Sequence, residues 1–219
     1  MDKKQLIKML SYFIMGDGGV YPKGDKAYFV MNMKEENRDY IEWVQNTLNE
    51  FVGTRLVERK DYNTDGCNRK PQLRLESKVH PMLMTLRERI YTDSYKGIDP
   101  HALKLLDWES LAILYMSDGS LYEDKPNPIK GLKNSSWNLT LNMKRLSYGD
   151  QLLLKKAIKE KFDLEFNINR QGKYYYLRLR TKDVAKFCYG VKPFMKESFL
   201  YKIRMINPSL EGGEIVCSS

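Results

Sequence analysis

The stretch LSYFIMGDGGVY, residues 10–21, joins an apolar run to a turn built around Asp17, with glycine on either side of the acid. An apolar run of this kind predicts a buried helix, and the glycines predict its end. The pattern returns in LAILYMSDGSLY, residues 111–122, where Asp118 stands in the place of Asp17. A lone stretch of this kind is more often a core helix running into a turn, but two copies indicate a repeated structural unit.

The repeat extends well beyond these two stretches. Three further tripeptides or dipeptides recur in the same order: Asn-Met-Lys at 32–34 and 142–144, Leu-Arg-Leu at 73–75 and 177–179, and Tyr-Lys at 95–96 and 201–202. Apolar residues at helical spacing fill 39–51 and 149–162, and alternating runs around them predict strands. The chain is therefore expected to contain two copies of one fold.

Each half reads helix, two strands, helix, two strands, helix. This order predicts an α+β fold of two pseudosymmetric αββαββα halves with antiparallel sheets. The boundary is expected near residues 97–106, which gives an N-terminal half of 1–98 and a C-terminal half of 99–219. The stretch 126–136, rich in Pro, Gly, Asn and Ser, predicts a longer hairpin loop in the second half only.

The composition favours a globular protein that meets a polyanion. The 219 residues carry a net charge of +9, and 42% of them are hydrophobic. Three distant cysteines, Cys67, Cys188 and Cys217, suggest neither a disulfide framework nor a zinc site, so a reducing cytoplasm or organellar matrix is expected. No apolar run approaches the length of a membrane span and no signal peptide is evident, so neither secretion nor a membrane is expected.

Strand parity sorts the side chains of the predicted sheets into two faces. The outward positions are rich in Arg, Asn, Gln and Tyr, which make contacts to bases and phosphates. An antiparallel sheet with one solvated face is the simpler interpretation of such a pattern. The sequence nevertheless predicts a DNA-binding face made of Tyr21, Lys23, Tyr28, Asn32, Lys34, Gln72, Arg74 and Glu76 in the first half, and Tyr122, Asn138, Thr140, Asn142, Lys144, Asn167, Asn169, Tyr176, Arg178 and Arg180 in the second.

The two motif stretches resemble the paired motifs of single-chain LAGLIDADG homing endonucleases, and the resemblance covers nearly the whole chain. It implies that the motif helices pack against each other at a central interface, with Asp17 and Asp118 at its base. It further implies that the two sheets form a saddle along the DNA major groove. The chain departs from the family pattern at Tyr12 and Ile113, where the family name has glycine, and a wider helix crossing would follow.

The resemblance also implies a metal-dependent active centre. Two adjacent carboxylates would repel each other unless divalent cations lay between them, and Mg²⁺ prefers such oxygen ligands. The metal site is expected at Asp17, Asp118, Gly16 and Ser117, with Mn²⁺ or Ca²⁺ able to substitute in binding. Lys96 and Lys202, each following a tyrosine and closing the last helix of its half, are expected beside it as catalytic residues, although a lysine at a helix end can serve the helix dipole alone.

The implied function is that of a monomeric, site-specific endonuclease that cuts both strands of a long, non-palindromic double-stranded DNA target, as in intron homing. Two alternatives remain on the same scaffold. One is an RNA maturase that binds intron RNA, and the other is a DNA-binding regulator without catalysis. The presence of both Asp17 and Asp118 favours the nuclease.

Overall fold

The computed structural model describes residues 1–59, 71–93, 95–125 and 136–203. The chain forms two compact units. Of the described residues, the first contains those of Met1–Leu106 together with Lys196–Phe199, and the second contains those of Asp107–Met195 and those from Leu200 to Ile203. The first unit thus reaches beyond the expected boundary at residue 98, because residues 99–106 pack within it.

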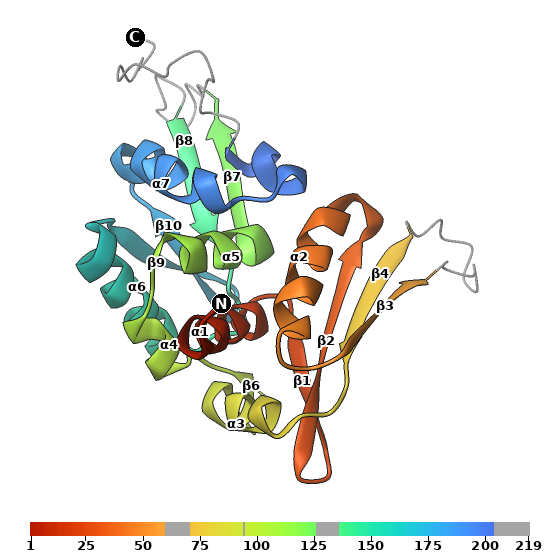
Figure 1. The fold of residues 1–219 in the computed structure, drawn as a ribbon. Coiled ribbons are helices and arrows are strands. Elements are labelled where there is room, and N and C mark those ends of the chain that lie inside the picture. The colour runs from red at the N-terminus through yellow and green to blue at the C-terminus, as the bar shows by residue number, and fades with distance from the viewer. Residues whose placement is uncertain (60–70, 94, 126–135, 204–219) are drawn as a thin grey trace. The chain divides into compact units, whose positions relative to one another are not determined.

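The first unit follows the predicted order, with a short hairpin and a short helix added at its end (Figure 1). Four of its strands form one antiparallel sheet in the order β1-β2-β4-β3, and β5 and β6 form a separate two-stranded sheet. Its elements are α1 (Lys3–Met15), β1 (Gly19–Lys23), β2 (Lys26–Lys34), the 3-10 turn η1 (Glu35–Asn37), α2 (Arg38–Asn49), β3 (Thr54–Arg59), β4 (Gln72–Ser77), α3 (Pro81–Ile90), β5 (Tyr91–Thr92), β6 (Tyr95–Lys96) and α4 (Pro100–Lys104).

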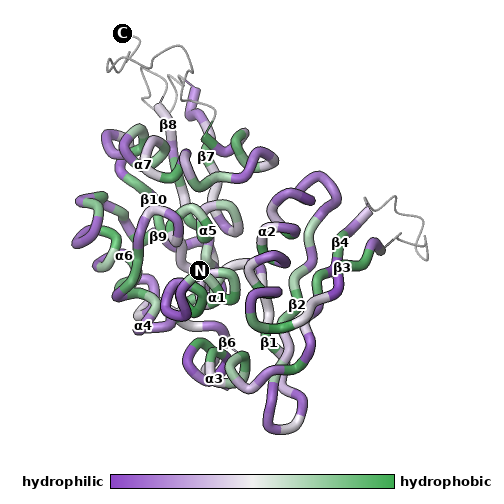
Figure 2. The backbone as a smooth tube through the Cα atoms, in the orientation of Figure 1, coloured by the Kyte–Doolittle hydropathy of each residue, from purple (hydrophilic) through white to green (hydrophobic). Residues whose placement is uncertain are grey.

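Alternation along β2 and β4 builds the core of this unit. Met31 lies opposite Leu75 and Met33 opposite Leu73, and all four side chains are buried. The helix α2 turns its apolar positions, which include Ile41, toward the core (Figure 2). The predicted strand parity is therefore confirmed for the first sheet, because the outward neighbours Asn32, Lys34 and Gln72 are exposed.

The second unit repeats the first. Its sheet has the equivalent strand order β7-β8-β10-β9, again antiparallel throughout, which confirms the pseudosymmetric α+β fold. The predicted hairpin loop at 126–136 lies almost wholly outside the described residues. The elements are α5 (Trp108–Asp118), β7 (Gly119–Asp124), β8 (Ser136–Leu141), α6 (Tyr148–Phe162), β9 (Phe166–Gln171), β10 (Tyr174–Leu179), η3 (Thr181–Asp183), α7 (Val184–Val191), η4 (Lys192–Phe194) and η5 (Glu197–Ile203).

The motif helices α1 and α5 are buried along the whole of their motif stretches. Every residue of 10–15 and of 111–116 is buried, on all sides of the helix. A helix that is apolar all round is a helix enclosed by its surroundings. That α1 and α5 pack against each other stays a prediction. Among the described residues, no helix is both long and apolar enough to cross a membrane.

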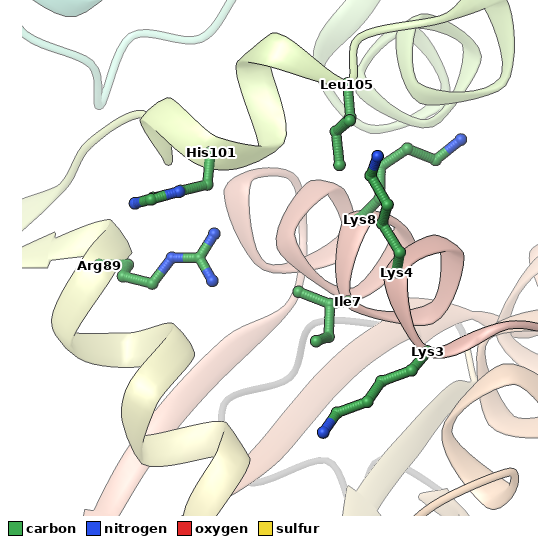
Figure 3. A pocket seen from close by; sticks show the side chains of 7 residues that line it. All are labelled: Lys3, Lys4, Ile7, Lys8, Arg89, His101 and Leu105. Atoms are coloured by element: carbon green, nitrogen blue, oxygen red, sulfur yellow. The ribbon is translucent and has the colours of Figure 1, made fainter.

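A buried acid fixes the end of the first unit. Asp99 is fully buried and caps α4 by accepting from the His101 backbone N–H at 2.9 Å. It also accepts from Ser11 Oγ of α1 at 2.8 Å and from the Arg89 guanidinium of α3 at 2.6 Å. Figure 3 shows Arg89 and His101 on these neighbouring elements, lining a pocket with Ile7 of α1. One carboxylate thereby ties the motif helix to α3 and α4, which explains why residues 99–106 belong to this unit.

Replacing Asp99 by Asn should destabilise the first unit by about 3 kcal/mol, the cost of breaking a buried ion pair from one side. Burial opposes ionisation of Asp99, but the bonds from Arg89 and Ser11 outweigh it and lower the pKa below its ordinary value of 3.8. The stabilisation is therefore present above that value and is lost as the pH falls through the folded-state pKa. Urea unfolding should be measured near neutral pH and near pH 3. The difference in the free energy of unfolding between variant and wild type should be smaller near pH 3. The exposed Asp25→Asn is the control and should change stability by less than about 0.5 kcal/mol.

Candidate active site and nucleic-acid interface

The first acid stands on a tight turn directly after α1. The Gly16 N–H donates to the Tyr12 carbonyl at 3.0 Å and the Gly18 N–H to the Phe13 carbonyl at 2.9 Å. A Cβ on Gly18 would clash with the Phe29 ring and would lie 2.7 Å from the Phe13 carbonyl oxygen. Glycine is required there by space, and the turn leaves the Asp17 side chain exposed beside a buried helix end.

The second acid has the equivalent place in the second unit. Asp118 is the last residue of α5 and is half-buried, and its carbonyl accepts from the Asn142 N–H at 2.7 Å. A Cβ on Gly119 would overlap the Tyr115 ring and its carbonyl oxygen. Ser117 Oγ, next to the acid, is buried without a hydrogen-bond partner among the described residues. Both motif glycines after the acid therefore serve close packing.

Each expected lysine lies against the motif helix of its own unit. Lys96 Nζ donates to the carbonyls of Gly16 at 2.8 Å and Gly18 at 2.5 Å. Lys202 Nζ donates to the carbonyls of Met116 at 2.7 Å and Tyr115 at 3.3 Å, and Tyr115 Oη donates back to the Lys202 carbonyl at 2.6 Å. Carbonyls at a helix C-terminus carry partial negative charge, so both ammonium groups are electrostatically favoured there.

The expected secondary structure of Lys96 was wrong. This residue lies in the two-residue strand β6 and not at the end of a helix, whereas Lys202 lies in the 3-10 helix η5. The two lysines are equivalent in sequence and in their contact with a motif helix, but they lie in different types of secondary structure. The catalytic role of both lysines stays a prediction.

The donor set near each acid consists of oxygen atoms. The Gly16 carbonyl adjoins Asp17 in the first unit and the Ser117 carbonyl adjoins Asp118 in the second, and such oxygen atoms suit a hard cation such as Mg²⁺. The Gly16 carbonyl is already an acceptor for Lys96. In the parts of the chain that the structure covers, no group of three or more His, Cys, Asp or Glu side chains could hold a metal ion.

The first sheet offers a polar face with an aromatic edge. Asn32 lies opposite Arg74 on neighbouring strands, and the rings of Tyr21 and Tyr28 lie 5.8 Å apart. Arg74 Nε donates to Glu76 Oε1 on the same strand. A hollow of about 650 Å³ lies at this edge, lined by Pro22, Lys23, Tyr28, Glu76, Ser77, Lys78 and Val79. Gln72 and Lys34 lie opposite each other and are exposed, so the predicted set of this half shares one accessible face.

The second sheet differs from expectation at two positions. Asn138 is 1% and Thr140 is 3% exposed, so neither presents a side chain to the surface. Asn138 is held by Asp124 and Arg178, and the Thr140 hydroxyl shares a 2.7 Å hydrogen bond with Ser120 and accepts from Asn142 at 3.1 Å. Parity predicted their direction correctly, but both side chains are buried in hydrogen bonds with other side chains of the same face. The strand also ends at Leu141, so Asn142 and Lys144 lie after it.

The rest of the predicted set in the second unit is accessible. Tyr122, Lys144, Asn167 and Arg180 are exposed, and Asn142, Asn169, Tyr176 and Arg178 are half-buried. A hollow of about 310 Å³ is lined by Asn167, Asn169, Arg178, Leu179, Arg180 and Thr181. Sequence reasoning missed Ser120 and Asp124, although the alternation that selected Tyr122 on β7 places both on the same face.

Comparison with known proteins finds relatives over most of the chain. A model of the LAGLIDADG DNA endonuclease family matches residues 8–187. Uncharacterized protein MJ1098 of Methanocaldococcus jannaschii is 26% identical over 196 residues, which cover 89% of this chain and 71% of that protein.

Two solved structures illustrate how widely the fold occurs. The homing endonuclease I-WcaI, bound to its DNA recognition sequence, is similar with a TM-score of 0.73 and 21% identity, covering 92% of this chain and 86% of that one. The N-terminal LAGLIDADG domain of DUF199/WhiA is similar with a TM-score of 0.54 and 17% identity, covering 93% and 88%. At these identities the likeness concerns the fold.

Proposed function

This chain belongs to the LAGLIDADG DNA endonuclease family, and from that premise we propose that it is a site-specific endonuclease that cuts both strands of a long, non-palindromic DNA target. One observation carries the proposal. In both units an acid stands at the end of a buried motif helix, a lysine is hydrogen-bonded to carbonyls at that helix end, and the unit presents a polar sheet face. The repetition of all three features supports a function that uses both units in the same way.

The acids would act through a divalent cation. When bound, Mg²⁺ would activate a water molecule and neutralise the charge on the departing oxygen. Asp17 and Asp118 would supply its carboxylate ligands and so orient the scissile phosphates. Asp17 lies in a glycine-bounded turn and Asp118 at a helix end, and packing fixes both, so little freedom remains for either backbone and this preorganisation favours catalysis.

The lysines would support the acids. Lys96 and Lys202 place a positive charge beside a turn that carries a negative one, which reduces the repulsion felt by the phosphate. They also hold the carbonyls of the acid-bearing turns, so each would help to fix the acid before the DNA arrives. An ammonium has three donors, and the Lys96 ammonium gives two of them to Gly16 and Gly18.

Incubating the protein and Mg²⁺ with a DNA library of candidate insertion sites, followed by sequencing of all cut ends, tests the proposal. The expected result is one long preferred site with a cut in each strand. Selective binding without cutting would favour the regulator, and selective binding of a folded intron RNA without cutting would favour the maturase. Either outcome would overturn the nuclease assignment.

The two units should read different arms of the target, because their outward residues differ at equivalent positions. Arg74→Ala and Arg178→Ala should each cost about 1–3 kcal/mol of discrimination at a single base pair, in opposite arms. Loss of a phosphate contact would instead weaken binding to all sequences alike. A binding profile over all single-base variants of the target decides this. If both variants relax the same arm, the division of labour is wrong.

A further inference from the structure

Three arginines on or beside the sheet faces, Arg74, Arg178 and Arg180, are already engaged by acids or amides of the same unit. Arg74 Nε donates to Glu76 Oε1, and Arg180 Nη1 forms an ion pair with Glu165 Oε2. Arg178 Nη2 donates to Asn138 Oδ1 and lies 3.9 Å from Asp124 Oδ2. On a face that only had to attract phosphate, these acids would be a disadvantage, since each repels a polyanion. Their presence calls for a different role.

The arrangement around Arg178 is the most developed. Asn138 Nδ2 donates to Asp124 Oδ2 at 2.6 Å, while its Oδ1 accepts from Arg178. A carboxylate can only accept, so it fixes the donor end of the amide toward itself and the acceptor end toward the guanidinium. Asn138 is buried and cannot reverse without facing an oxygen with an oxygen. The amide therefore transmits the orientation set by Asp124 to Arg178.

Sheet register explains why these three residues meet. They lie on β7, β8 and β10, which are consecutive in the sheet. Asp124 pairs with Ser136 and Arg178 with Thr140, so Asn138 lies one diagonal step from both on the same face. The first unit holds Arg74 by a different route, through Glu76 two residues along the same strand. In both units, therefore, side chains of the same sheet hold an arginine in place, although the contacts differ.

We infer that Asp124 and Asn138 are positioning residues for base recognition, and that they hold Arg178 ready for a base edge with two acceptors, as in guanine. This rests on the proposed function. A guanidinium restrained by an amide and a carboxylate loses less freedom on meeting guanine O6 and N7, and it is less available to a phosphate at an arbitrary sequence. Asp124 thus lowers non-specific binding and raises selectivity, and Glu76 does the same for Arg74.

The test is a binding profile of the full chain without cleavage, in Ca²⁺, over all single-base variants of the selected target and over random-sequence DNA. Asp124→Asn should bind random DNA more tightly than the wild type and should lose roughly tenfold of its preference at the base pair that Arg178→Ala also relaxes. Glu76→Gln should behave in the same way in the other arm.

Glu123→Gln is the matched control, because Glu123 is the exposed neighbour of Asp124 on the opposite face of β7. It removes the same charge and should leave every base preference intact. Asp124→Ser removes the charge by another route and should repeat the result if Asp124→Asn unfolds more readily. Should both Asp124 variants keep the wild-type preference at that base pair, the inference is wrong while the proposed function stands. If the wild type binds all sequences equally, both the inference and the proposed function are wrong.

Discussion

Replacing Asp17 or Asp118 by Asn is expected to slow cleavage about a thousandfold or more, with selective DNA binding retained. A bound cation contributes several kcal/mol of transition-state stabilisation, and each 1.36 kcal/mol is about a factor of ten in rate. An amide is a much poorer ligand for a hard cation than a carboxylate. Binding should survive because, in the proposed function, the sheet faces and not the acids would contact the bases. Single-turnover cleavage and equilibrium binding of the same target measure the two effects separately.

Glu160→Gln provides the control, because Glu160 is exposed on α6 and its exchange removes the same charge. It should cleave at the wild-type rate. An Asn variant at either motif acid that cuts as fast as the wild type would show that the acids do not carry the chemistry. Loss of selective binding in the same variants would instead assign them to recognition.

Affinity for DNA should fall steeply with salt. The net charge is +9, and the accessible basic residues on the sheets or just after their strands include Lys23, Lys34, Lys144 and Arg180. Each phosphate neutralised adds about −0.9 to the slope of log affinity against log salt, so six to ten contacts would weaken binding by about 10³ to 10⁵ between about 50 and 200 mM salt. Titrations of a labelled duplex over this range give the slope. A nearly constant affinity would mean that the basic charge has no part in DNA binding.

The fold could be predicted because the same pattern of helices and strands occurs twice in the sequence. Alternation in Phe29, Met31 and Met33 fixed one face of β2, and the same pattern in Leu73 and Leu75 fixed the facing strand, as the register confirms. The end of each motif helix was also predictable from its glycines, and Gly18 and Gly119 are both required by close packing. Local patterns suffice where each residue interacts mainly with its own strand or helix.

How far each side chain on the sheet face is buried could not be predicted in this way. Parity places Asn138 and Arg178 on one face, but burial of Asn138 depends on side chains from β7 and β10, far away in the sequence. Lys96 was misplaced for a related reason. Its Tyr-Lys pair matches that of Lys202, yet β6 forms only by pairing with β5, which two residues of strand do not reveal. Pairing between strands decides both cases.

Mapping both cut ends on a duplex that carries the selected site tests the central claim most directly. With Mg²⁺, the wild-type protein should cut each strand once within the selected site, and chelation of the metal should stop both cuts. A duplex that is bound selectively but stays intact in Mg²⁺ and in Mn²⁺ would contradict the claim that this chain is a double-strand endonuclease.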